Sequence, residues 1–174
     1  MPKRLLRKLL PDHRRIREHP HLSRFGARLH DPNLWHLNRR SVAGGTALGL
    51  FTSMIPFPGQ MIIAAALAIW VRVNLPLSVA LVWLTNPLTM PPIYFFAYKV
   101  GAWVLGRAPR DVNFELSVKW VGEELATIWE PFLLGCFICG VLAAALGYGA
   151  VRLLWRWQVI HTWELRKERR RKAR

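Results

Sequence analysis

The feature that most constrains this 174-residue chain is the stretch 41–106, which contains no Asp and no Glu. Its only formal charges are Arg72 and Lys99. A chain of this length cannot bury so long an apolar stretch in a water-soluble core and still cover that core with polar surface. We therefore expect 41–106 to lie in a membrane, and the chain to be an all-α integral membrane protein.

The same stretch resembles itself after a shift of 33 positions. Residues 47–71 align with residues 80–104, with 7 identities in 25 positions, and the segment TSMIPFPG aligns with TNPLTMPP. Closely spaced prolines end a helix, so each unit is predicted to be a proline-broken helix. The alternative is a chance similarity between two apolar segments that contain proline. Four helical pieces follow from this pattern: 41–55, 59–73, 77–86 and 92–105.

None of these pieces comfortably crosses a hydrocarbon core of about 30 Å at about 1.5 Å per residue. Backbone groups freed at a break need protein or water partners, so re-entrant segments fit better than full-length spans. The small face formed by Gly44, Gly45 and Gly49 is predicted to let another helix pack closely.

Paired breaks in two halves of a membrane protein indicate a binding site near the membrane midplane. The helix N-termini that follow the breaks favour an anion, and two basic residues could assist them. The candidate substrate-binding residues are Thr52, Ser53, Pro58, Gly59, Gln60, Thr85, Asn86, Thr89 and Pro91, with Arg72 and Lys99. In the alternative interpretation, the small polar side chains only satisfy backbone groups freed by proline, Arg72 is an interfacial anchor and Lys99 snorkels.

One segment, Phe132 to Trp155, is long and apolar enough to cross alone, and the region containing it is set at 131–157. Cys136 and Cys139 within it are predicted to be packing residues, because two thiols alone make neither a metal site nor a disulfide framework. The preceding region, 107–130, is predicted to form an amphipathic connecting segment.

Both ends of the chain are strongly basic. Residues 1–40 carry 11 Lys/Arg and 3 acids, and residues 152–174 carry 9 and 2. The segment 1–40 is predicted to be interfacial and the tail 158–174 solvated, both attracted to anionic lipid headgroups; a disordered tail is the alternative for the former. The positive-inside tendency puts both termini in the cytoplasm. Two equivalent units plus one span would put them on opposite sides, so one of these inferences must fail.

The sequence offers no paired carboxylates, no nucleophile beside a base, no metal cluster and no phosphate loop, so we expect neither an enzyme nor a cofactor. Nothing indicates a nucleic-acid reader. The leading hypothesis is a translocator or binder of an anionic, lipid-linked substrate. The second is a membrane assembly or scaffold subunit, with a homo-oligomer or a membrane partner as its assembly.

Four motifs carry a resemblance: RSVAGGTALGLF, IPFPGQ, NLPLS and WLTNPLTMPP. They resemble the bacterial membrane-protein family catalogued as domain of unknown function 2062, over roughly Trp35 to Tyr148. The resemblance implies a small inner-membrane protein of Gram-negative type, from a family without an established activity; we expect it to be a multi-pass protein.

Overall fold

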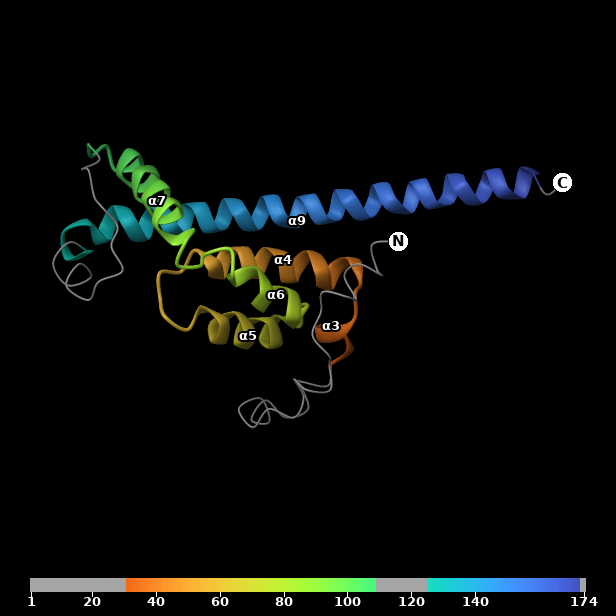
Figure 1. Ribbon diagram of the computed structural model, residues 1–174, viewed down its shortest axis with the longest axis horizontal. Helices are drawn as coiled ribbons and strands as arrows, with labels where there is room; N and C mark the ends of the chain where they lie inside the picture. The colour runs from red at the N-terminus through yellow and green to blue at the C-terminus, as the bar shows by residue number, and fades with distance from the viewer. Residues whose placement is uncertain (1–30, 109–124, 173–174) are drawn as a thin grey trace.

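The computed structural model describes residues 31–108 and 125–172, and over these residues every regular element is a helix. The expected all-α class is confirmed for this part of the chain. The helices are α3 (Pro32–Trp35), α4 (Arg39–Ser53), α5 (Gln60–Val71), α6 (Leu75–Val82), α7 (Met90–Val104) and α9 (Leu125–Lys172), as Figure 1 shows. The interfacial helix predicted near the N-terminus lies outside the described residues.

Helices α4, α5 and α6 form a compact group in which the chain reverses twice. The α4 helix is capped at its start by Asn38, whose side chain accepts a hydrogen bond from Ser41 N at 2.7 Å, and it ends at Ser53, shortly before Pro56. The chain then returns along α5, and α6 runs beside α4 in the same direction (Figure 1). A hydrogen bond of 3.2 Å from Asn74 N to Ser41 O joins the beginnings of α4 and α6.

Glycines bring α4 and α6 close together. A Cβ on Gly45 would lie 2.7 Å from Asn74 O, and a Cβ on Gly49 would lie 2.6 Å from Ser78 O. Real Cβ atoms do not approach backbone oxygens so closely, so only glycine allows this separation of the two helices. The predicted packing role of this glycine face is confirmed.

The α7 helix leaves this group and packs against α9 instead of folding back along α6. At their crossing, a Cβ on Gly101 would lie 1.8 Å from Pro131 O, and a Cβ on Gly135 would lie 1.7 Å from Ala97 O. The two aligned sequence units therefore fold differently, because α5 returns beside α4 whereas α7 is held by α9. The edge-to-face contact of Tyr94 and Phe132, with ring centroids 5.5 Å apart, belongs to the same interface.

The α9 helix is longer than the span expected at 131–157. Its apolar part, Ile128–Trp163, makes it the one helix among the described residues that is long and apolar enough to cross a membrane. Leu125–Glu130, expected to belong to a separate connecting segment, form its first turns, while residues 109–124 lie outside the description. The tail from residue 158 is not a separate segment either, because the helix continues to Lys172. Helix-forming Leu, Lys, Arg and Glu side chains in the tail favour this continuation.

The shorter helices deviate from their expected bounds at the prolines and caps. The predicted 77–86 helix is α6, which begins two residues earlier and ends four residues earlier. Asn74 caps its start, accepting from Leu77 N at 3.0 Å, and Pro87 disfavours helical backbone at Asn86. The folded part also begins before residue 41, because Leu34 and Trp35 of α3 are buried against α5 and α6.

Candidate functional site

The two proline-containing breaks, residues 54–59 and 83–89, meet in space. Thr85 lies in the second break, and its Oγ1 is 2.7 Å from the carbonyl oxygen of Ser53, the last residue of α4. The same hydroxyl lies 3.2 Å from Gln60 Oε1, at the first residue of α5. A hydroxyl has one proton to donate, and the shorter distance favours the bond to Ser53 O.

Gln60 connects the first break to α7. Its Nε2 donates to Ile55 O and to the hydroxyl of Tyr94, the latter at 3.0 Å. The Tyr94 hydroxyl also lies 3.4 Å from Ile55 O, to which it donates. Gln60, Thr85 and Tyr94 are buried. We call Ser53, Ile55, Gln60, Thr85 and Tyr94 the break cluster.

The remaining polar candidates hold the backbone at the breaks. Thr52 and Ser53 donate within α4, to Leu48 O at 2.9 Å and to Leu50 O at 2.8 Å. Asn86 Oδ1 accepts from Thr89 N at 3.1 Å, and the Thr89 hydroxyl donates to Leu84 O at 2.6 Å. The bonds of Ser53, Asn86 and Thr89 are the ones that the backbone interpretation predicts, since they satisfy groups that the ended helices leave free, whereas the Thr52 hydroxyl donates to a carbonyl within α4.

The three remaining break residues shape the turns. Gly59 has φ 104° and serves as the N-terminal cap of α5, a conformation that favours glycine. Pro58 and Gly59 are exposed, and Pro91 occupies the first turn of α7, where its missing N–H costs no hydrogen bond.

The two basic candidates do not lie in the break cluster. Arg72 follows α5, and the helix separates it from Gln60 by twelve residues, or about 18 Å at about 1.5 Å per residue. Lys99 is exposed on α7, and its Nζ lies 4.3 Å from the centroid of the Phe95 ring. All five residues of the break cluster are uncharged, and neither basic candidate adds a charge to it.

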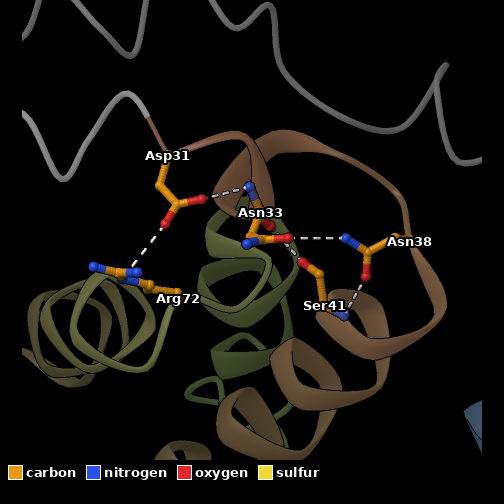
Figure 2. A network of polar contacts seen from close by, with 5 residues as sticks. All are labelled: Asp31, Asn33, Asn38, Ser41 and Arg72. Carbon is orange, nitrogen blue, oxygen red and sulfur yellow. Dashed lines mark hydrogen bonds and ion pairs between the residues drawn. The ribbon is translucent and has the colours of Figure 1, made fainter.

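Arg72 belongs to a second polar network, which fastens α3 to the rest of the fold (Figure 2). Its Nε lies 3.4 Å from Asp31 Oδ2, and Asp31 Oδ1 accepts from Asn33 N at 2.9 Å. Asn33 O accepts from the Ser41 hydroxyl at 2.5 Å, and Asn38 Nδ2 donates to Asn33 Oδ1 at 3.2 Å. Sequence reasoning missed this network, although Asp31 followed by Pro32 is a typical helix start.

Sequence reasoning also missed an apolar groove of about 550 Å³ beside the break cluster. Side chains from both breaks, α7 and α9 line it: Met54, Leu84, Pro92, Ile93, Phe96, Cys139, Leu142, Ala143 and Leu146. No local pattern signals this groove, because its walls come from segments that only the fold brings together.

The contacts that α9 makes with α7 and α4 show at which point along α9 the break cluster lies. Near one end of the interface, Gly101 of α7 faces Pro131; further along, Gly140 faces Phe51 and Met54 at the end of α4, and Gly147 faces Leu50. The end of α4 and the groove therefore lie opposite the middle of the stretch of α9 that packs on the other helices. No group of three or more His, Cys, Asp or Glu residues that could hold a metal occurs among the described residues.

Polar and apolar side chains are distributed unusually. The buried polar residues are Ser41, Thr52, Ser53, Gln60, Asn74, Ser78 and Thr85. Many large apolar side chains are exposed instead, and they occur on α5, on α7 and along α9, including Ile62 (76%), Trp70 (72%), Trp103 (80%), Leu146 (73%) and Leu153 (68%). Soluble monomers rarely expose apolar surface on this scale.

Over residues 31–108 and 125–172 the fold is thus all-helical, with one helix long and apolar enough to cross a membrane. Residues 22–164 match the model of a family described as an uncharacterized protein conserved in bacteria (DUF2062). The chain belongs to this family, as its motifs indicated. No curated protein and no solved structure matches the chain significantly.

Proposed function

We propose that the chain is a multi-pass protein of the bacterial inner membrane that binds and translocates a lipid-linked anionic substrate at the break cluster. The observation that carries the membrane location is the exposure of large apolar side chains around an interior that contains Ser, Thr, Asn and Gln. Burial of small and polar residues between helices, with large apolar residues outside, is the pattern expected in lipid.

The helix arrangement supports two crossings and one re-entrant hairpin. The α4 helix enters and α5 returns, so this pair makes no net crossing. The α6 helix, the second break and α7 together make one broken crossing, and α9 makes the second. This topology removes the conflict between the repeat and the charge distribution, because an even number of crossings leaves both termini on one side.

The charges agree with this orientation. Arg39, Arg40 and Arg72 lie at one end of the α4–α6 group, and the register of α9 against α4 brings Arg156 near the same level. The other end carries the pair Arg107 and Glu130, 2.7 Å apart and without net charge. By the positive-inside rule, the arginine-rich end faces the cytoplasm.

Reporter fusions test the topology. A fusion after Ala108 is expected to be active as alkaline phosphatase, which requires the periplasm. At Arg174, a reporter that works only in the cytoplasm is expected to be active, and alkaline phosphatase is expected to be inactive. Activity of both fusions in the same compartment would contradict the two-crossing topology.

The position of the break cluster supports a translocation role. Broken helices that meet near mid-depth are the common construction of transporter sites, in which helix N-termini attract anions. Since neither Arg72 nor Lys99 reaches the cluster, the positive potential there comes from the start of α5 at Gly59 and of α7 at Thr89. Gln60 and Tyr94 supply polar groups that a passing headgroup can exchange hydrogen bonds with.

A liposome assay tests this role. Purified protein is reconstituted into liposomes that contain a fluorescent phosphatidylglycerol. Transfer of this lipid between the leaflets is followed by quenching the fluorescence of the lipid in the outer leaflet. We expect transfer above the protein-free rate, a lower rate for Gln60→Leu, and an unchanged rate for Lys99→Ala, because Lys99 faces outward. Equal transfer with and without protein would rule out translocation of this lipid.

A scaffold role is the second candidate, and the length of α9 favours it. Beyond Arg152 most of its described side chains are exposed, including Leu154, Trp157 and Trp163. A chain truncated after Gln158 separates the two roles: a translocator keeps its transfer activity, whereas a scaffold loses its co-purifying partner.

A further inference from the structure

We propose that the apolar groove between the breaks, α7 and α9 binds one acyl chain of a membrane lipid, which enters sideways from the bilayer. The proposal rests on the membrane location proposed above, and it names the part of a lipid substrate that the protein binds. The groove's volume of about 550 Å³ falls within the roughly 300–1,000 Å³ typical of small-molecule sites.

The chemistry of the lining fits a hydrocarbon chain and not a headgroup. Met54 and Leu84 come from the breaks, and Pro92, Ile93 and Phe96 come from α7. The α9 wall consists of Cys139, Leu142, Ala143 and Leu146. No lining residue is charged, so the favourable contribution to binding is the burial of apolar surface and close packing.

The rim of the groove is continuous with the apolar exterior. Leu84, Phe96, Leu142 and Leu146 line the groove and are also exposed, with Leu146 73% and Phe96 64% accessible. The groove therefore opens onto the same surface that the membrane location exposes to lipid tails. The described residues at this rim are apolar, so an acyl chain that enters there meets apolar side chains.

A helix from a second copy of the chain fits this place less well. A helix with its side chains is about 10–12 Å across, and membrane helices approach closely through small residues. Four of the glycines on these two helices, Gly101, Gly135, Gly140 and Gly147, are already occupied by contacts within the protein, and Gly149, which is open, does not line the groove. The open rim offers branched and aromatic side chains instead, between which a narrow, flexible chain can lie.

The inner end of the groove lies beside the break cluster. Met54 lines the groove and directly follows Ser53, whose carbonyl oxygen accepts from Thr85; Ile93 lines it and directly precedes Tyr94. An acyl chain in the groove thus contacts Met54 and Ile93, which are direct neighbours in sequence of the break-cluster residues Ser53 and Tyr94. A lipid tail in the groove therefore lies beside the place where the two breaks meet.

The test is photo-crosslinking in proteoliposomes with a phosphatidylglycerol that carries a diazirine in the middle of one acyl chain. We expect adducts on residues 92–96 and 139–146 of the full-length protein. Ala143→Trp fills the groove and is expected to lose these adducts, whereas Ala145→Trp, an exposed neighbour outside the lining, is expected to keep them. Ala143→Leu provides a smaller filling change, expected to reduce the adducts partly, should the Trp variant fail to fold.

The outcomes separate this inference from the proposed function. Adducts on Trp70 and Trp103 without adducts in the groove would overturn the acyl-chain site and leave the membrane location intact. Absence of adducts throughout both residues 41–106 and residues 128–163 would contradict both. Equal loss of adducts in Ala143→Trp and Ala145→Trp would overturn the acyl chain as the occupant of the groove.

Discussion

The hydroxyl oxygen of Ser78 on α6 lies 3.1 Å from the carbonyl oxygen of Gly45 on α4, and these residues are 33 positions apart. The same offset separates Ser41 and Asn74, which are joined by a backbone hydrogen bond. It is also the shift at which the sequence aligns with itself. The register of the two parallel helices therefore matches the register of the sequence similarity. These two contacts hold α4 and α6 side by side in the same direction. The ends of the two helices, and with them the two breaks, therefore lie close together.

The glycine crossing of α7 and α9 predicts a steep dependence on side-chain size. Gly135→Ala introduces a Cβ that would lie 1.7 Å from Ala97 O, so the helices must separate. We expect a loss of about 1–3 kcal/mol or more in the free energy of unfolding, measured in detergent by denaturant titration. Gly149→Ala is the matched control, because a Cβ at Gly149 meets nothing within 4 Å. Equal stability of the two variants would contradict the close crossing.

The break cluster predicts coupling between Gln60 and Thr85. Gln60→Leu removes the donor to the Tyr94 hydroxyl, and Thr85→Val removes the donor to Ser53 O, so each leaves a buried partner without that hydrogen bond at a cost of about 1–3 kcal/mol. Because the residues are in contact, the double variant is expected to depart from additivity by about 0.5–3 kcal/mol. Thr162→Val serves as the control, since that hydroxyl only donates to Gln158 O of its own helix. Strict additivity of the two changes would show that the cluster is not one unit.

Asn74 combines a useful group with an unsatisfied one. Its Oδ1 caps α6, whereas its buried Nδ2 has no hydrogen-bond partner among the described residues. Asn74→Ala loses the cap and is expected to cost about 1 kcal/mol. Asn74→Ser keeps a capping oxygen and removes the unpaired amide, so we expect it to be more stable than the Ala variant in the same unfolding measurement. The reverse order would contradict the assignment of the cap.

Arg72 makes two opposite contributions to stability: its backbone conformation is unfavourable, and its ion pair with Asp31 is favourable. Its φ of 59° is left-handed, which costs a non-glycine residue about 1–2 kcal/mol. Its side chain is 65% exposed, so the pair with Asp31 is worth at most about 1 kcal/mol. We expect Arg72→Gly to be as stable as the parent or more stable. Asp31→Asn, which keeps the cap on α3 and loses the charge, measures the pair alone; a loss well above 1 kcal/mol in that variant would reverse the expectation.

Local signals in the sequence predicted most of the helices. Prolines at 56, 58, 87, 91 and 92 end or begin helices through their own geometry, and an apolar, uncharged stretch predicts helices by composition. Among the site residues, Gln60 and Thr85 were found because uncharged polar side chains stand out beside proline breaks in an apolar stretch. Tyr94 was not found, since a tyrosine in an apolar helix is equally well explained by packing.

Partner choice could not be predicted from the sequence. The crossing of Gly101 and Gly135 decides that α7 packs on α9, yet neither glycine differs by local pattern from those that join α4 to α6. For the same reason, the sequence could not decide whether the two aligned units fold alike. The separation of Arg72 from Gln60 along α5 follows from helix length, but the direction of α5 depends on long-range contacts.

The 48 residues of α9 have a further consequence. At about 1.5 Å per residue the helix is about 72 Å long, more than twice the roughly 30 Å thickness of a hydrocarbon core. A single unbroken rod of this length cannot lie wholly within a bilayer unless it tilts steeply, and its packing on α4 and α7 opposes such a tilt. With the membrane location proposed above, the helix itself would carry its basic end away from the lipid surface, at a distance that the length of α9 sets.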